Sequence, residues 1–116
     1  MPTVKPQKLA HNILSVVMPV YNEEATLSEI VSRVLRQPIV GQLVIVDDAS
    51  RDSTPQILSK IARNPKVQVI THDKNLGKGA AIRSASTYLK FPYVIIQDAD
   101  LEYDPSQYPK IIEPIF

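Results

Sequence analysis

Two carboxylates separated by one residue, Asp98 and Asp100, are the feature of this sequence best suited to chemistry. They directly follow an apolar run at residues 93–97 that predicts a buried strand. Mg²⁺ and Mn²⁺ prefer oxygen ligands, and Mg²⁺ commonly binds through one or two carboxylates together with phosphate oxygens and water. The pair therefore predicts a site for a divalent cation, to which Glu102 could add a third oxygen. The alternative for such a motif taken alone is a solvated acidic turn.

A second acidic pair, Asp47 and Asp48, follows the apolar run at residues 42–46. Adjacent carboxylates repel one another unless they are solvated, paired or hydrogen-bonded to donors. Asp48 is the better candidate for ligand contact, as an acceptor for a base or a ribose. Asp47 could equally cap a turn, because serine and aspartate follow at Ser50 and Asp52.

The first apolar run is followed by a rigid proline, an aromatic ring and a carboxylate, at Pro19, Tyr21 and Glu23. The ring could stack on a base, and the carboxylate could accept a hydrogen bond from the edge of that base. The alternative is a strand exit with Asn22 as a helix cap. Both can hold together, since a cap at Asn22 would aim its neighbours into a cleft.

The segment Asn75-Leu76-Gly77-Lys78-Gly79 predicts a loop that leads into a helix. Its glycines let the backbone approach a ligand closely, and its lysine suits a phosphate. The P-loop and G-x-G-x-x-G patterns are both absent, so ATP hydrolysis and dinucleotide binding lack their signatures. A plain glycine turn is the alternative.

The elements that must position these residues alternate along the chain. Strands are predicted at residues 14–20, 42–46, 67–71 and 93–97, with helices beginning near Asn22, near Ser53 and after Gly77 and Gly79. Nearly continuous apolar strands are typical of parallel sheets covered on both faces. The pattern predicts an α/β fold, a doubly wound, mostly parallel sheet with helices on both faces. Ligands bind such sheets at the carboxyl ends of the strands, where all four polar clusters would gather.

Composition fits one domain, at residues 13–116, after a flexible N-terminal tail at residues 1–12. Thirteen Lys and Arg against twelve Asp and Glu leave a net charge of +1, which gives no reason to expect nucleic acid as a partner. Cysteine is absent, so disulfides and thiolate metal sites are excluded. No apolar run approaches the ~20 residues of a membrane span. His11 and His72 stand isolated, and neither is assigned a catalytic role.

Four segments, in this order, closely resemble family 2 glycosyltransferases with a GT-A fold: residues 17–24, 46–50, 75–79 and 97–105. The branch that acts on polyprenol or dolichyl phosphates is the most similar. The segments span most of the chain, so agreement by chance is improbable.

The resemblance implies metal-dependent, inverting transfer of a sugar from a nucleoside diphosphate, of the GDP-mannose or UDP-glucose type, to a polyprenyl phosphate. Mg²⁺ or Mn²⁺ would bind at Asp98 and Asp100, and possible catalytic bases are Asp100 or a residue outside this chain. The positions implied to bind the nucleotide sugar are Pro19, Tyr21, Glu23, Asp48, Asn75, Lys78, Asp98, Ala99 and Asp100.

Family members continue past the end of this sequence, so residues 13–116 are expected to be a donor-binding domain truncated at its C-terminus. Alone, it should bind nucleotide weakly and transfer no sugar. Apolar surface left uncovered would favour self-association into a homo-oligomer. The expected location is cytoplasmic or, for the full-length protein, the cytoplasmic face of a membrane.

Two other functions fit parts of the pattern. A fragment that binds nucleotide without catalysis would keep the same fold and motifs. A receiver-like phospho-acceptor signalling domain has a similar length and an acidic pair after a strand. It also needs a fifth strand followed by lysine, which this sequence does not offer.

Overall fold

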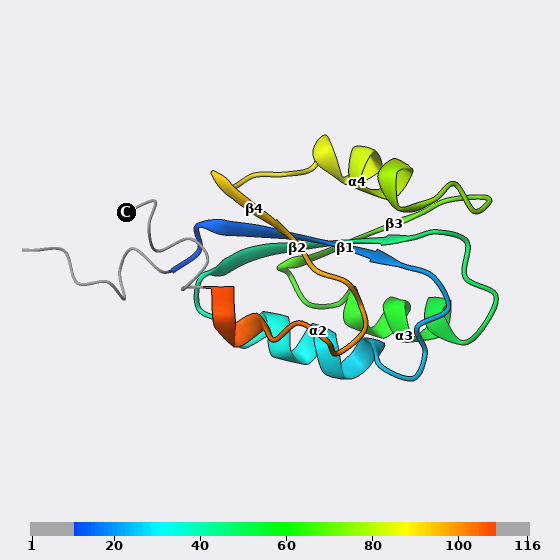
Figure 1. Cartoon of the computed structure of the whole chain (residues 1–116), viewed down its shortest axis with the longest axis horizontal. Helices are drawn as coiled ribbons and strands as arrows, with labels where there is room; N and C mark the ends of the chain where they lie inside the picture. Colours follow the sequence, from blue (N-terminus) through cyan, green and yellow to red (C-terminus); the bar gives the residue numbers. More distant parts are fainter. Residues whose placement is uncertain (1–10, 109–116) are drawn as a thin grey trace, which may run out of the picture.

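The computed structural model describes residues 11–108, in which four parallel strands form a single sheet (Figure 1). The strands are β1 (Leu14–Val20), β2 (Val40–Asp47), β3 (Val67–Thr71) and β4 (Tyr93–Ile96), in the order β3-β2-β1-β4. The register places Val20 beside Asp47, and Asp47 beside Thr71. The polar residues that follow these three strands therefore leave the sheet at the same level.

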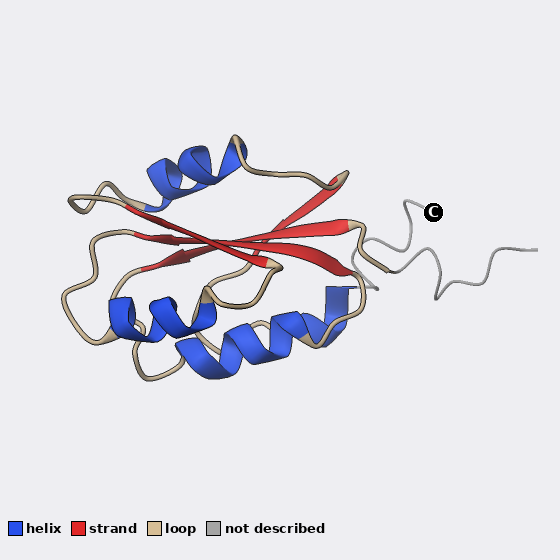
Figure 2. Ribbon diagram, turned by 180° about the vertical axis from the view of Figure 1, so that it is seen from behind, coloured by secondary structure: helices blue, strands red, loops and turns tan. Residues whose placement is uncertain are grey.

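Within the described residues, three α-helices cover the two faces of this sheet (Figure 2). The helices α2 (Leu27–Leu35) and α3 (Thr54–Ile61) lie on one face, and α4 (Lys78–Ser86) lies on the other. After β3 the chain crosses over through α4 and returns on the far side of β1, as β4. The strand order thus reverses between β1 and β4, which confirms the doubly wound α/β fold and marks where such folds bind ligands.

The core has two layers of unequal size. Alternate residues of β1, beginning at Leu14 and Val16, pack with Ile30 and other apolar residues of the α2 face. On the α4 face the buried layer is thinner, because the fully buried side chains of α4 are the small Ala81 and Ala85, with Ile82 partly buried beside them. Strands buried on both faces explain why their sequences are nearly continuously apolar.

The start of α2 differs from the prediction. The helix begins at Leu27 with Thr26 at its N-cap, not at Asn22. Asn22 has a φ of +53°, in the left-handed region, and its side chain accepts a hydrogen bond from the N–H of Arg51. A tertiary contact with the segment after β2 therefore holds the chain in a turn here.

The other elements agree closely with the sequence. The second strand is longer than predicted, and the fourth is one residue shorter. A short 3-10 helix, η1 (Pro105–Gln107), packs beside α2. Of the predicted tail, residues 1–10 lie outside the described part, as do residues 109–116. Within residues 11–108, no helix has the length and apolar character needed to cross a bilayer.

Candidate ligand site at the carboxyl edge of the sheet

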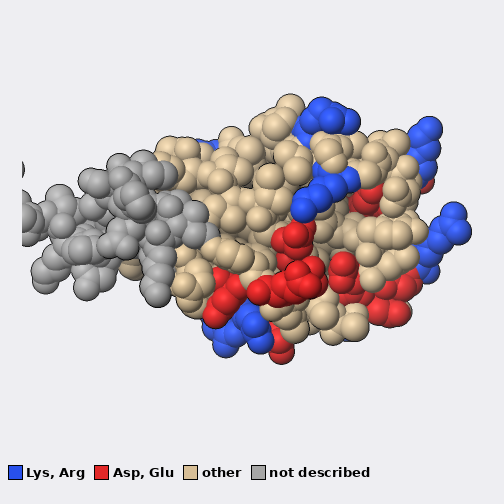
Figure 3. Space-filling view, in the orientation of Figure 1, with Lys and Arg blue, Asp and Glu red and all other residues tan. Residues whose placement is uncertain are grey.

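A pocket of about 190 Å³ opens at the carboxyl ends of β1, β2 and β4. It is lined by Pro19, Val20, Tyr21, Glu23, Asp48, Lys78, Ala81 and Asp98. Six of the predicted site residues thus come together, from segments far apart in the sequence. Figure 3 shows acidic side chains gathered on this face of the molecule, next to basic ones. A larger cavity of about 500 Å³ lies at the opposite, amino end of the strands, away from these polar clusters.

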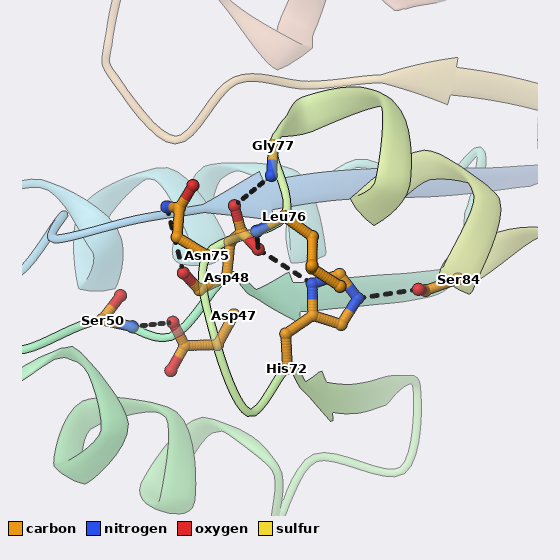
Figure 4. Close-up of polar contacts among 8 residues, drawn as sticks. All are labelled: Asp47, Asp48, Ser50, His72, Asn75, Leu76, Gly77 and Ser84. Carbon is orange, nitrogen blue, oxygen red and sulfur yellow. Dashed lines mark hydrogen bonds and ion pairs between the residues drawn. The ribbon is translucent and has the colours of Figure 1, made fainter.

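Asp48 organises the segment that leads into α4 (Figure 4). Its Oδ1 accepts hydrogen bonds from the N–H of Leu76 at 2.8 Å and pairs with Nδ1 of His72 at 2.9 Å. Its Oδ2 accepts from the N–H of Gly77 at 2.8 Å. Burial acts to raise the pKa of Asp48, but the hydrogen bonds from His72, Leu76 and Gly77 together outweigh it, so the pKa lies below its usual value. The carboxylate is ionised at neutral pH and held rigidly at the pocket wall.

Asp47 has a different partner from its neighbour. Its Oδ1 accepts a hydrogen bond from the N–H of Ser50 at 3.0 Å, which closes the turn after β2. Ala49 within this turn has a φ of +65°. The geometry is that of the turn-capping alternative, and the adjacent carboxylates avoid each other because each engages its own donors.

Hydrogen bonds connect the segment after β1 to the segments that follow β2 and β4. The N–H of Glu23 donates to Thr54 Oγ1 at 3.0 Å, next to the start of α3. The hydroxyl of Thr26 donates to the carbonyl oxygen of Ala99 at 2.8 Å. Tyr21 is 44% exposed, so one aromatic surface remains open to a ligand at the pocket. Ala99 itself is buried and supplies its backbone, not its side chain.

At the exit of β4, Asp98 is paired with Lys78, the first residue of α4. Nζ of Lys78 lies 2.8 Å from Oδ1 of Asp98, and the Asp98 side chain is 55% exposed. Asp100 lies outside the pocket lining, and its Oδ1 accepts a hydrogen bond from the N–H of Glu102. Among the described residues, no three His, Cys, Asp or Glu side chains form a cluster suited to a metal ion. Glu102 is therefore not gathered with the acidic pair as a third ligand.

The segment at residues 75–79 divides between two pockets. Gly77, at the N-cap of α4, has a φ of +94°, which glycine adopts readily. Lys78 then lies in the 190 Å³ pocket. Asn75 instead lines an adjacent pocket with Tyr21 and His72, and its side chain donates to the carbonyl oxygen of Asp48.

Two residues that hold the site were not singled out from the sequence. His72 is not isolated: its side chain is only 8% exposed and bridges Asp48 and Ser84. Its position directly after β3, level with the acidic pair, was the available signal. Gln97 is buried and donates to the carbonyl oxygens of Asp98 and Tyr103, which shapes the loop after β4.

Comparison with known proteins identifies the family. The profile described as Glycosyl transferase family 2 matches residues 15–116. An undecaprenyl-phosphate 4-deoxy-4-formamido-L-arabinose transferase from Edwardsiella ictaluri is 36% identical over 106 residues, which cover 86% of this chain and 33% of that protein. A relative of the same name from Pseudomonas fluorescens is 38% identical, with 85% and 31% covered. The chain thus spans about a third of the length of these curated relatives.

Solved structures agree with this result. A mannosyltransferase from Pyrobaculum calidifontis, in complex with GDP-Man and Mn²⁺, is 27% identical with a TM-score of 0.69, and the match covers 78% of this chain and 28% of that one. TarS 1–349 from S. aureus, in complex with UDP-GlcNAc, is 25% identical with a TM-score of 0.75, over 88% and 30% of the two chains. The chain belongs to glycosyl transferase family 2.

Proposed function

We propose that this chain is the donor-binding part of a glycosyltransferase that moves a sugar from a nucleoside diphosphate to a polyprenyl phosphate. The observation that carries the proposal is the pocket at the reversal of strand order, where an aromatic ring, carboxylates and a lysine meet. The names of the relatives support the acceptor, and the GDP-Man and UDP-GlcNAc complexes of similar structures support the donor class.

The nucleoside would occupy the part of the pocket formed by β1 and β2. The exposed ring of Tyr21 offers a stacking surface for a base. Asp48 and Glu23 offer acceptors for base or ribose donors. Of the roughly four acceptor positions of a carboxylate, the chain itself uses three at Asp48, which leaves one for a ligand.

The diphosphate would lie between Lys78 and the exit of β4. Three carboxylates and one ammonium line the pocket, so its formal charge is −2 at neutral pH. A diphosphate is itself an anion and would be repelled unless a cation accompanies it. Asp98 and Asp100 provide a hard-oxygen donor set, and Mg²⁺ can use two carboxylates with phosphate oxygens and water. Asp98 and Asp100 would hold Mg²⁺ or Mn²⁺, which when bound would supply electrophilic stabilisation for the leaving diphosphate.

In the transfer itself, an acceptor oxygen would attack the anomeric carbon in line with the departing diphosphate and invert that centre. Lys78 would leave Asp98 and stabilise the negative charge that develops on the leaving group. Of the two candidate bases, Asp100 would be engaged by the metal ion, so a base for the acceptor would come from outside this chain. A polyprenyl phosphate is a lipid, so the full-length protein would work at a membrane surface, for which the cytoplasmic face stays our prediction.

Calorimetry tests this proposal. The chain is titrated with UDP-glucose and GDP-mannose, each with Mn²⁺ and with a chelator. We expect binding of at least one donor that requires the metal and that weakens about tenfold or more in Asp98→Ala and Asp100→Ala. The matched control is Glu29→Ala, an exposed carboxylate on α2 that lines neither this pocket nor the adjacent one, and this variant should bind as the parent does.

The metal assignment would be refuted if donor affinity were unchanged by the chelator and by both aspartate substitutions. No binding of either donor under any condition would refute the donor site itself.

A further inference from the structure

The imidazole of His72 connects the carboxyl end of β2 to helix α4. Nδ1 lies 2.9 Å from Asp48 Oδ1, and Nε2 lies 2.7 Å from Ser84 Oγ. Figure 4 shows the ring between these two partners, with both ring nitrogens engaged. The backbone N–H of His72 also donates to the carbonyl oxygen of Asp47 at 2.9 Å. The residue is therefore fixed by its main chain and by both ends of its side chain.

The identity of the partners determines the proton positions. An ionised carboxylate only accepts hydrogen bonds, so Nδ1 of His72 carries a hydrogen toward Asp48. In the neutral ring Nε2 then accepts, and the hydroxyl of Ser84 donates to it. Replacing either partner leaves a buried ring nitrogen without its bond.

The same carboxylate closes a loop around itself. Asp48 bonds to the ring of His72 and also accepts hydrogen bonds from the N–H groups of Leu76 and Gly77. These two residues lie four and five positions after His72. Both ends of the loop at residues 72–77 thus converge on one side chain. Lys78 follows directly, so the orientation of Asp48 also determines where α4 begins and where the lysine enters the pocket.

We propose that His72 and Ser84 are positioning residues for the donor: through Asp48 they hold the loop at residues 72–77, and hence Lys78, in the arrangement that receives a nucleoside diphosphate. This inference rests on the proposed function. Its physical basis is that the bond to Ser84 fixes the His72 ring, and the ring in turn fixes Oδ1 of Asp48, a carboxylate that lines the pocket.

Amide substitutions at residue 72 separate the two ends of the ring. In His72→Asn the side-chain amide lies near the former Nδ1 and can still donate to Asp48. In His72→Gln the amide lies near the former Nε2 and can reach Ser84, but it leaves Asp48 without this donor. The two variants have similar size and polarity, so they control for each other, and Ser84→Ala tests the far partner.

Two measurements are made on each variant of the full chain: hydrogen exchange of the Leu76 and Gly77 amides by NMR, and calorimetric affinity for UDP and GDP with Mn²⁺. We expect His72→Gln to speed both exchange rates and weaken nucleotide affinity about tenfold. His72→Asn should stay within about threefold of the parent in both measurements, and Ser84→Ala should fall between the two.

The inference is overturned if His72→Gln retains the parent's exchange rates, or if exchange accelerates while affinity is unchanged. It is also overturned if His72→Asn is as impaired as His72→Gln, since the bond to Asp48 would then not matter. A parent chain that binds neither nucleotide would instead refute the donor site, and the inference would fall with it. The behaviour of the parent therefore separates the two failures.

Discussion

Replacing Asp48 by asparagine should destabilise the fold far more than its isosteric shape suggests. Asp48 accepts from the N–H groups of Leu76 and Gly77 and from the ring of His72, through both of its oxygens. Asparagine has one acceptor oxygen, so its NH₂ group must face at least one of these donors. The loss of a charge-assisted bond, together with an unsatisfied N–H, costs about 3 kcal/mol. With an unfolding entropy of about 0.24 kcal/mol per kelvin for a chain of 116 residues, Tm should fall by about 12 °C.

The matched control is the same substitution at the adjacent residue. Asp47 is equally buried but uses one oxygen to accept one bond, from Ser50, and an asparagine oxygen can replace it. Asp47→Asn should therefore cost under about 1 kcal/mol. Thermal and urea unfolding at pH 7 measure both variants. Equal losses at the two positions would refute the assignment of Asp48 as the organiser of the loop.

The pH dependence of stability supplies a second check on Asp48. The folded pKa lies below the ordinary value of 3.8, so ionisation of Asp48 contributes stability above that pH. The contribution is lost as the pH falls through the lower, folded pKa. The difference in unfolding free energy between the parent and Asp48→Asn should therefore narrow below pH 3.8. A difference that stays constant to pH 2 would contradict this reasoning.

Further substitutions test other parts of the site. Gly77→Ala should lower stability by about 1 kcal/mol because of its positive φ, although no atom lies near the added Cβ. Gly79→Ala, within α4 and in ordinary contact distance, should instead raise stability by up to about 1 kcal/mol. Gly41→Ala should be destabilising, because its Cβ would lie 2.6 Å from the Phe91 ring, and a double variant with Phe91→Ala should recover part of the loss. Lys78→Met should shift Tm by only about 2 °C yet weaken nucleotide binding about tenfold. Thermal unfolding measures the changes in stability, and calorimetry measures nucleotide binding. If Gly79→Ala lowered stability as much as Gly77→Ala, the positive φ of Gly77 could not be the cause.

The sequence predicts the fold well because its strands carry their own signal. The runs at residues 14–20 and 67–71 are strands with these bounds, since β-branched residues bounded by turn formers need no distant partner to be recognised. The convergence of the strand ends also follows, because parallel strands joined by helices must all end at one edge. The start of α2 was missed because Asn22 is held in a left-handed turn by Ser50 and Arg51, which lie 28 and 29 residues away.

The division of roles among the polar residues could not be predicted from spacing. Asp47 and Asp48 are adjacent, yet one caps a turn and the other holds the loop that leads into α4. The bond from His72 to Ser84 spans a loop and two turns of α4, so its partner becomes visible only in three dimensions. The separation of Asn75 from Lys78 depends on the positive φ of Gly77, which turns the chain between them.

The pairing of Lys78 with Asp98 means that the pocket carries its own counterion. An ion pair this exposed contributes at most about 1 kcal/mol, so exchanging partners costs the protein little. Ligand binding would then be an exchange of partners. The incoming anion would pair with Lys78, and the incoming cation would pair with Asp98. Breaking the Lys78–Asp98 pair costs little, so the pair itself would not select among ligands. Selectivity would depend on how well the anion and the cation bind together.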